Sequence, residues 1–527
     1  MESKNNNYLI PILMAISITI GLFLGNSLSS KKELIVTDEE SRYQKIQDIM
    51  DILDRCYVDS VDGDAVFEST IVDMLHRLDP HSSYIPAEEL KKMNESIHGK
   101  FGGVGIRFFI IRDTVCITNV IPFSPSLLAG LESGDKILEV DGKKVAGIKI
   151  TNDKVMDLLK GVEGTEVNIR LLRNGKKIKK TVVRGSIPVQ SVVASYMINN
   201  EIGYVKINQF SVATSAEFKR AAESLRAQGL KKMILDLRNN GGGVLTGATD
   251  IADEFLPENV PIVETRGVHS PTYTYKATSI GTLENIELVI LINTNSASAS
   301  EILAGAIQDN DRGTIMGRRS FGKGLVQEDR LLRDGSNLRL TIARYYTPTG
   351  RCIQKAYTDD VKAYYEDQRE RYDNGEMYKV DSSLFVDSLK FITPKGKVVY
   401  GGGGIMPDIF VPFDTSGSSW YLSELRYSSV FQTFAFDFVQ NKRKKWKSPA
   451  YFGRSFDVSD VLLDQFFDFA LKHNNIAANL KDQQYSKKRI SNLLKAEIAR
   501  QLWVEQGFYK ITNTSDQDVL RAIEFLR

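Results

Sequence analysis

Three serines alternate with alanines in the stretch "NTNSASASEI", residues 293–302. The run before it, "ELVILI", is apolar and β-branched like a buried strand, and "SEILAGAIQD" has apolar residues at helical spacing. A small-residue turn between a buried strand and a helix can expose a hydroxyl nucleophile at the helix N-terminus. The same serines could instead cap the helix, because Ser is a favoured N-cap and Glu301 would complete a capping box. The stretch alone leaves both interpretations open.

A serine nucleophile needs a base to accept its proton, and histidine is the usual one. The chain has five histidines, of which His81 in "LDPHSSY" and His269 in "RGVHSPTY" lie in loop-like stretches. A Ser-His hydrolase is therefore one alternative. A lysine can take the same role when burial in an apolar pocket lowers its pKa.

One lysine has a suitable setting. Lys323 lies between two glycines in "GRRSFGKGLVQ", residues 317–327, just before an apolar strand-like run. The stretch also matches most of a phosphate-binding loop. That interpretation fails because position 324 is Gly rather than Ser or Thr, and because a strand pattern follows where a helix is required.

Composition limits the remaining function classes. At 527 residues the chain is long enough for about three or four domains. A net charge of +2 argues against a nucleic-acid-binding protein, which needs a concentrated basic surface. The three cysteines are scattered and lack the spacing of a disulfide framework or a zinc site, so we expect no metal.

The N-terminus carries a targeting signal. Residues 8–24, "YLIPILMAISITIGLFL", hold no charge and are close to the length that spans a bilayer. A cleaved signal peptide and a retained anchor are both compatible with the run, and its length favours an uncleaved anchor. We therefore predict a signal or membrane anchor over residues 1–30.

The hydrophobic patterns divide the rest of the chain into four segments. Amphipathic helical patterns over 38–94 are followed by short strands and glycine turns over 95–185. Strands alternate with helices over 186–412, and a charge-rich helical extension occupies 415–527. The predicted fold is an α/β core interrupted by a β-rich domain, with helical elements at both ends.

The β-rich segment resembles a PDZ domain through "FGGVGI", "SPSLLAGLESGDKILEVDGKKV" and "GVEGTEVNIRLLRNGK". Consecutive glycines before a strand can leave backbone amides free to bind a carboxylate, and the strand edge can accept an extended peptide. The resemblance implies capture of a peptide C-terminus at Gly103, Val104, Gly105 and Ile106. A PDZ domain does no chemistry, so a membrane-tethered, catalytically silent scaffold is a second alternative.

The stretches "LDLRNNGGG", "NSASASEILAGAIQDNDRGTIMG" and "SFGKGLVQ" together resemble the C-terminal processing proteases, the tail-specific Ser-Lys peptidases. "LDPHSSYIP", "YYTPTGRCIQ" and "GGGGIMPD" extend the resemblance over about residues 40–412. It implies Ser298 as the nucleophile, Lys323 as the base and Gln327 as the residue that orients the lysine. The amides of Ala299 and Gly242 are the implied oxyanion donors, although that family often has proline where this chain has Gly241.

The same resemblance implies an α/β protease core that contains a PDZ domain and needs no cofactor. Its substrates would be polypeptides with free C-termini. Together with the predicted N-terminal anchor, this places cleavage in the cell envelope, on the periplasmic side of the membrane.

The extension over 415–527 lies outside that resemblance. Its stretch "SKKRISNLLKAEIARQLWVEQGF" has an apolar stripe at helical spacing. The stripe either packs on its own core or forms a homodimer or partner interface, for which Trp503, Phe508 and Tyr509 would be aromatic anchors.

Overall fold

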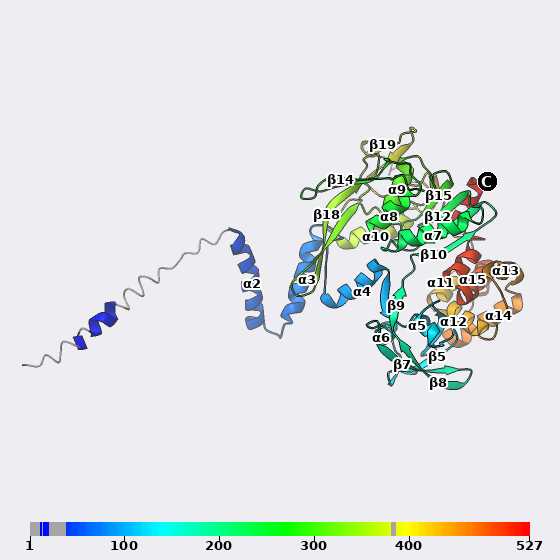
Figure 1. Ribbon diagram of the computed structural model, residues 1–527, viewed down its shortest axis with the longest axis horizontal. Coiled ribbons are helices and arrows are strands. Elements are labelled where there is room, and N and C mark those ends of the chain that lie inside the picture. Colours follow the sequence, from blue (N-terminus) through cyan, green and yellow to red (C-terminus); the bar gives the residue numbers. More distant parts are fainter. Residues whose placement is uncertain (1–10, 13, 21–37, 381–385) are drawn as a thin grey trace, which may run out of the picture. The chain divides into compact units, whose positions relative to one another are not determined.

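The structure is a computed structural model that describes residues 11–12, 14–20, 38–380 and 386–527 (Figure 1). The chain divides into two compact units, Met1–Leu75 and His76–Arg527. The first unit holds α2 (Asp38–Cys56) and most of α3 (Gly63–His76), as the helical patterns predict. Among the described residues, no helix is long and apolar enough to cross a membrane. The structure describes only residues 11–12 and 14–20 of the anchor predicted over residues 1–30, and the other residues of that segment lie outside the described part of the chain.

The segment predicted to be a PDZ domain forms an antiparallel sheet of six strands. Its order is β3-β4-β5-β7-β8, with β6 paired to β5. Strand β2 (Lys100–Gly103), where the chain enters this segment, pairs with β9 (Gly185–Pro188), where the chain leaves it. The other elements are α4 (Ala87–His98), β3 (Ile106–Ile111), β4 (Thr114–Val120), α5 (Pro125–Leu128), β5 (Lys136–Val140), β6 (Lys143–Lys144), α6 (Asn152–Leu159), β7 (Glu166–Arg173) and β8 (Lys176–Val183).

The segment predicted to be the α/β core is built on a second six-stranded sheet of order β10-β11-β12-β15-β16-β21, parallel except for β10. The predicted strands "KMILDL" and "ELVILI" are β12 and β15. Its elements are β10 (Val192–Met197), β11 (Ile202–Ile207), α7 (Thr214–Arg226), β12 (Lys232–Asp236), α8 (Leu245–Asp253), β15 (Glu287–Ile292), α9 (Ala299–Asp309), β16 (Thr314–Gly317) and β21 (Ile409–Phe410).

Both faces of this sheet are covered, which is why its strands are continuous apolar runs. Leu235 and Ile290 face the helices α7, α8 and α9, seen in green beside β12 and β15 in Figure 1. Their neighbours Ile234 and Val289 face the opposite side, where Val519 of the C-terminal extension packs on them. Successive side chains of a strand point to opposite faces, so each strand contributes to two cores.

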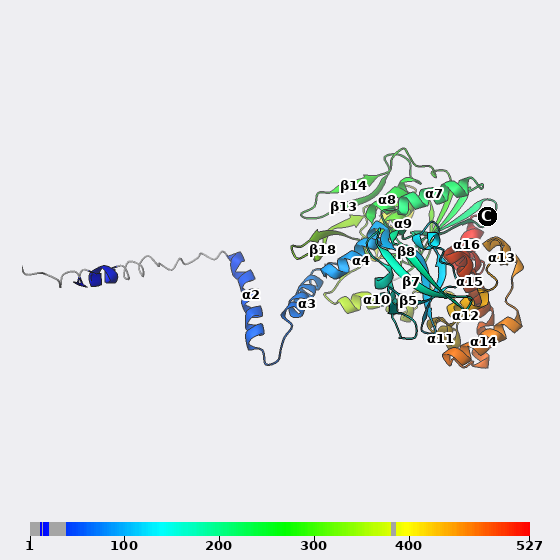
Figure 2. The same cartoon turned by 60° about the horizontal axis from the view of Figure 1, so that its bottom comes forward.

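A five-stranded antiparallel sheet lies beside this layer. Its order is β1-β18-β13-β14, with β17 paired to β18; Figure 2 labels β13, β14 and β18 together. The loop between β16 and β17, which contains Lys323 and is called the lysine loop below, leads directly into β17. The bounds are β1 (Ser83–Ile85), β13 (Pro261–Arg266), β14 (Tyr273–Lys276), β17 (Leu325–Leu331) and β18 (Asn337–Tyr346), followed by α10 (Val361–Asp373), η2 (Asp387–Leu389), β19 (Lys390–Ile392) and β20 (Val398–Tyr400).

The C-terminal extension is helical, as predicted. Its helices are α11 (Trp420–Tyr427), α12 (Val430–Val439), α13 (Pro449–Ser455), α14 (Asp460–Asn474), α15 (Leu480–Thr512) and α16 (Gln517–Phe525). Helices α11–α15 enclose a core of their own, and α15 is kinked where Trp503 and Val504 leave helical geometry.

The predicted aromatic anchors of this extension lie against their own chain. The Trp503 ring is 5.6 Å from that of Phe452, and the Tyr509 ring is 6.4 Å from that of Tyr204 in β11. The stripe therefore packs on the protein's own core, and the homodimer stays a prediction.

Candidate active site

The alternating serines occupy the turn between β15 and α9. Ser298 has φ 55° and ψ −114°, a backbone conformation that costs a non-glycine residue about 1–3 kcal/mol. A strained strand-to-helix turn of this kind is typical of nucleophilic serines, because it exposes the serine hydroxyl to the substrate. Ser298 is half-buried, whereas Ser296 and Ser300 are fully buried. Only the middle serine of the run is therefore open to a substrate.

The two flanking serines hold the turn in place. The Ser296 hydroxyl donates to the carbonyl of Leu237 (2.9 Å) and accepts the amide of Asn293. The Ser300 hydroxyl donates to the carbonyl of Asn240 (2.9 Å). The bonds to Leu237 and Asn240 tie the serine turn to the "LDLRNNGGG" loop that follows β12.

Glu301 connects the serine to the lysine loop. One of its carboxylate oxygens, Oε2, accepts the amides of Ser298 (2.8 Å) and Lys323 (2.9 Å). The other, Oε1, accepts the amide of Gly322 and the hydroxyl of Ser320. Burial raises the pKa of this carboxyl to about 7, although the hydrogen bonds oppose the shift. The capping interaction predicted for Glu301 is present, and it also positions the lysine loop.

Tyr345 of β18 supports the same two residues from the other side. Its buried hydroxyl lies 2.7 Å from the carbonyl oxygen of Lys323 and 3.2 Å from that of Ser298. The backbones of the predicted nucleophile and base are therefore anchored to a common carboxylate and a common phenol. Sequence reasoning missed Tyr345, because nothing local to "LRLTIARYY" distinguishes it from a core tyrosine.

The setting of Lys323 favours its neutral form. Burial lowers the pKa of the ammonium from 10.5 to about 8, and the positive charge of Arg339 adds to this shift. The carboxylates of Glu301 and Asp79 act in the opposite direction. With this pKa about a tenth of the lysine is neutral at pH 7, far more than for an ordinary lysine, and the neutral amine is the form that a general base requires.

The predicted orienting residue, Gln327, lies on β17. Its side-chain amide nitrogen is 3.3 Å from the hydroxyl of Thr341 on β18. That hydroxyl in turn lies 3.1 Å from a carboxylate oxygen of Asp79 in "LDPHSSYIP". Asp79 and Thr341 thus fix Gln327, and neither was singled out from the sequence because the three are distant along the chain.

Gly242, the predicted second oxyanion donor, lies against the serine turn. A Cβ at this residue would lie 2.8 Å from that of Ser298 and 2.9 Å from the amide nitrogen of Ala299, and its φ is 97°, so a glycine is required. Its amide donates to Oδ1 of Asn240 (2.9 Å). Gly242 can bind an oxyanion only when Asn240 releases that amide.

His81 lies next to this site, among aromatic rings. Its Nε2 is 3.0 Å from the hydroxyl of Tyr364, and its ring packs edge-on against Phe321. Burial and then the charge of Lys323 lower the pKa of the imidazole to about 3, against the opposing effect of Asp79. An imidazole with this pKa is a poor proton acceptor at neutral pH.

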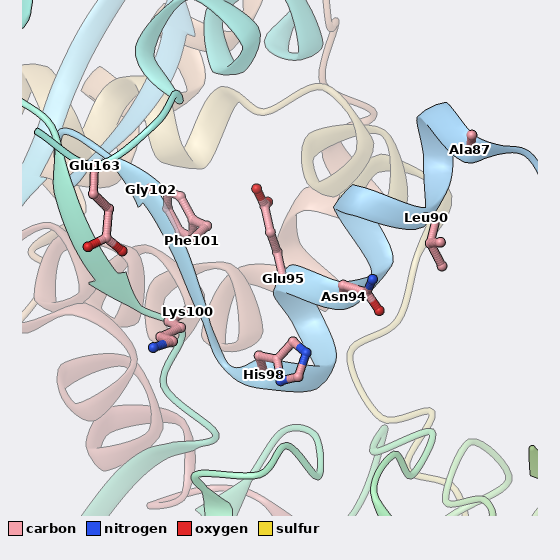
Figure 3. A pocket seen from close by; sticks show the side chains of 9 residues that line it. All are labelled: Ala87, Leu90, Asn94, Glu95, His98, Lys100, Phe101, Gly102 and Glu163. Atoms are coloured by element: carbon pink, nitrogen blue, oxygen red, sulfur yellow. The ribbon is translucent and has the colours of Figure 1, made fainter. Parts of the chain in front are cut away.

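The predicted peptide-binding loop lies between β2 and β3. Gly105 has φ 81°, and a Cβ there would lie 2.3 Å from that of Ser124, so the loop requires glycine at this position. A pocket of about 480 Å³ adjoins β2 (Figure 3). It is separate from Ser298 and lies between α4 and β2, where the side chain of Glu95 lies between the two elements. Glu95 pairs with Lys160, whose ammonium lies 4.6 Å from the Phe101 ring centre.

Known protein families and relatives match most of the chain. The profile of peptidase family S41 covers residues 201–363, a PDZ domain profile covers 102–183, and a family of unknown function covers 421–504. The carboxy-terminal-processing protease of Bartonella bacilliformis is 37% identical over 345 residues, which are 63% of this chain and 78% of the relative. A probable CtpA-like serine protease of Staphylococcus saprophyticus is 30% identical over 68% of this chain and 73% of its own.

Among solved structures, the photosystem II D1 C-terminal processing protease covers 71% of this chain and 93% of its own, at 25% identity and a TM-score of 0.35. The identity and coverage of the curated relatives are sufficient to assign the family. The chain belongs to peptidase family S41 and is a serine peptidase of the carboxy-terminal-processing type, with a PDZ domain.

Proposed function

We propose that this peptidase cleaves polypeptides by a Ser-Lys mechanism, with Ser298 as nucleophile and Lys323 as general base. The observation that carries the proposal is the shared anchoring of the two residues on Glu301, together with the lowered pKa of the Lys323 amine. A serine hydroxyl is a weak nucleophile until a neighbouring base accepts its proton.

The neutral amine of Lys323 accepts the Ser298 proton while Oγ attacks the peptide carbonyl. The tetrahedral oxyanion binds to the amide of Ala299 and to that of Gly242, once Asn240 has released it. The intermediate collapses when the Lys323 ammonium returns the proton to the leaving amine. Water, deprotonated by the same lysine, then hydrolyses the acyl-enzyme. Gln327, held by Thr341, orients the lysine amine.

Two observations disfavour a Ser-His mechanism. His81 lies beside the lysine, but its Nε2 is engaged with Tyr364, and its pKa of about 3 makes it a weak base. His269 lies in the connection between β13 and β14. Under the proposal His81→Gln retains a base and Lys323→Ala does not, so comparing the peptide cleavage of the two variants distinguishes the mechanisms. Loss of activity in His81→Gln alone, with Lys323→Ala active, would contradict the proposal.

The PDZ domain selects substrates by their C-termini in this proposal. The loop Gly103–Ile106 binds the terminal carboxylate, and the edge of β3 accepts the preceding residues by β-addition. A peptide with a free apolar C-terminus should therefore be cleaved with a lower KM than the same peptide with an amidated C-terminus. Equal KM values for the two peptides would remove the PDZ part of the proposal.

We place this activity in the cell envelope, with the protein tethered by its N-terminal segment. The support is the uncharged run of residues 8–24, whose length and position are typical of a signal anchor. Fractionation of cells that express the full chain tests this. The protein should sediment with membranes and stay there in high salt, and recovery in the soluble fraction would contradict the tether.

A further inference from the structure

The C-terminal helix α16 reaches both loops that carry the proposed catalytic groups. The side chains of Val519 and Ala522, and of Leu526 just after the helix, are buried against the face of the core sheet opposite to α9. At its N-terminus, Asp516 caps the helix and Asp518 lies in the first turn. Figure 2 shows α16 in red beside α15 at the end of the chain.

The first loop follows β12 and contains Arg238. This guanidinium is almost fully buried and donates to both carboxylate oxygens of Asp516 (2.9 Å each) and to Oδ2 of Asp518 (2.8 Å). It also donates to Asp236 at the end of β12. Arg238 is two residues before Asn240, whose carbonyl accepts the amide of Ala297 in the serine turn.

The second loop follows β16 and contains Arg318, five residues before Lys323. This guanidinium is also buried and forms a bidentate pair with Asp518, at 2.8 Å to Oδ1 and 2.7 Å to Oδ2. Its Nη1 also donates to the carbonyl of Val411 (2.9 Å). One carboxylate of α16 therefore binds the arginines of both loops.

The charges of this cluster are balanced. The cations Lys206, Arg238 and Arg318 face the carboxylates Asp236, Asp516 and Asp518. Burial alone would lower the pKa of Arg238, and the three carboxylates more than offset it, so this arginine stays charged. Bidentate arginine–carboxylate pairs are rigid in geometry as well as strong, so they fix the backbone that carries them.

We propose that Asp518, assisted by Asp516, is a positioning residue that fixes two loops relative to each other: the loop after β12, which contains Gly242, and the loop after β16, which contains Lys323. The proposal rests on the Ser-Lys function above. A shift of the loops by a fraction of an ångström displaces the oxyanion amide and the base relative to Ser298, and catalysis depends steeply on such geometry. Substrate capture by the PDZ domain does not involve these contacts.

The test compares Asp518→Asn with wild type in the full chain, with cleavage of one peptide that has a free apolar C-terminus. We expect kcat to fall by about tenfold or more while KM stays within about twofold, because interactions that act on the transition state are lost. Asp518→Glu, which keeps the charge, should recover part of kcat. Glu524→Gln, an exposed pair with Arg521 on the same helix, is the matched control and should retain wild-type kcat.

A folded Asp518→Asn with wild-type kcat would overturn the proposal, and so would an equal loss of kcat in Glu524→Gln. Removing one partner of a buried ion cluster can prevent folding, so Asp516→Asn, which leaves the Arg318 pair intact, is measured as well. We expect its kcat to fall by about threefold or more per folded molecule, since it weakens only the contacts of Arg238, which keeps its bonds to Asp236 and Asp518. Unchanged kcat in this variant would also overturn the proposal.

The Ser298→Ala variant, measured in the same assay, distinguishes failure of the positioning role from failure of the Ser-Lys function. An inactive Ser298→Ala with a fully active, folded Asp518→Asn refutes the positioning role alone. An active Ser298→Ala refutes the Ser-Lys function and the positioning role with it.

Discussion

Glu301 lies one helical turn after Ser298 and accepts the amide of that serine at 2.8 Å. The same carboxylate accepts the amide of Lys323, which lies in the loop between β16 and β17. A carboxylate that is fully buried and bound to four donors fixes both segments at once, which a simple helix cap does not require.

Replacing this carboxylate by its neutral isostere should damage both folding and activity. In Glu301→Gln, the NH₂ group faces two donors whichever way the amide is turned, so two buried hydrogen bonds are lost. We expect a loss of about 2–4 kcal/mol in the free energy of unfolding, measured by denaturant titration, and at least about tenfold in kcat. Glu258→Gln, at an exposed glutamate, is the control. A Glu301→Gln enzyme as stable and active as wild type would show that the bridge is dispensable.

Activity should rise with pH through a midpoint near 8. Only the neutral amine of Lys323 can accept the Ser298 proton, and its pKa is lowered to about 8 by burial and the charge of Arg339. Below that value kcat/KM should fall by about tenfold per pH unit. Steady-state kinetics between pH 5.5 and 9.5 measure this profile. A midpoint near 6.5 that His81→Gln abolishes would indicate a histidine base instead.

The lysine should also weaken the fold at neutral pH. The folded protein disfavours its charged form, so between about pH 8 and 10.5 the unfolded chain binds more protons and stability rises with pH. Below pH 8 the full penalty is present. We therefore expect Lys323→Met to raise the free energy of unfolding at pH 7 by about 1–2 kcal/mol.

This gain should shrink as the pH approaches 10.5. Urea titrations at pH 7 and pH 10 test the effect, with the exposed Lys154→Met as control. Equal stability of Lys323→Met and wild type at both pH values would mean that the amine is not desolvated.

Removal of the C-terminal extension should make the protein insoluble. A chain that ends at Asp414 loses α16, so Ile234 and Val289 of the core sheet become exposed to solvent. Exposed apolar faces of this kind aggregate. Expression with solubility and size measurements tests this. A soluble, active fragment would show that the extension is an accessory module, and a reduction of its oligomeric state would support the homodimer predicted from the tail.

The sequence predicted the strand–turn–helix around Ser298 because the apolar run, the small residues and the helical spacing are local signals. The helices of the first unit and of the extension were predicted for the same reason. The carboxylate bridge of Glu301 could be predicted only as far as the N-cap, since its other three donors, from Ser320 to Lys323, are close in space but not in the local pattern.

The network behind Gln327 could not be predicted. Asp79, Thr341 and Gln327 meet because β1, β18 and β17 pair side by side, and strand order across such distances leaves no periodic signal in one sequence. The contact between Gly242 and Asn240 was missed for a different reason. It depends on the loop conformation at a residue of φ 97°, which glycine permits but does not specify.

The role of Ser298 is tested most directly by the rate at which a peptide with a free apolar C-terminus is cleaved by wild type, Ser298→Ala, Lys323→Ala and the double variant. We predict that the three variants are inactive to the same extent, because members of one catalytic unit are not additive, and that all three stay folded at the assay temperature. Cleavage by Ser298→Ala at a rate comparable to that of wild type would contradict the account.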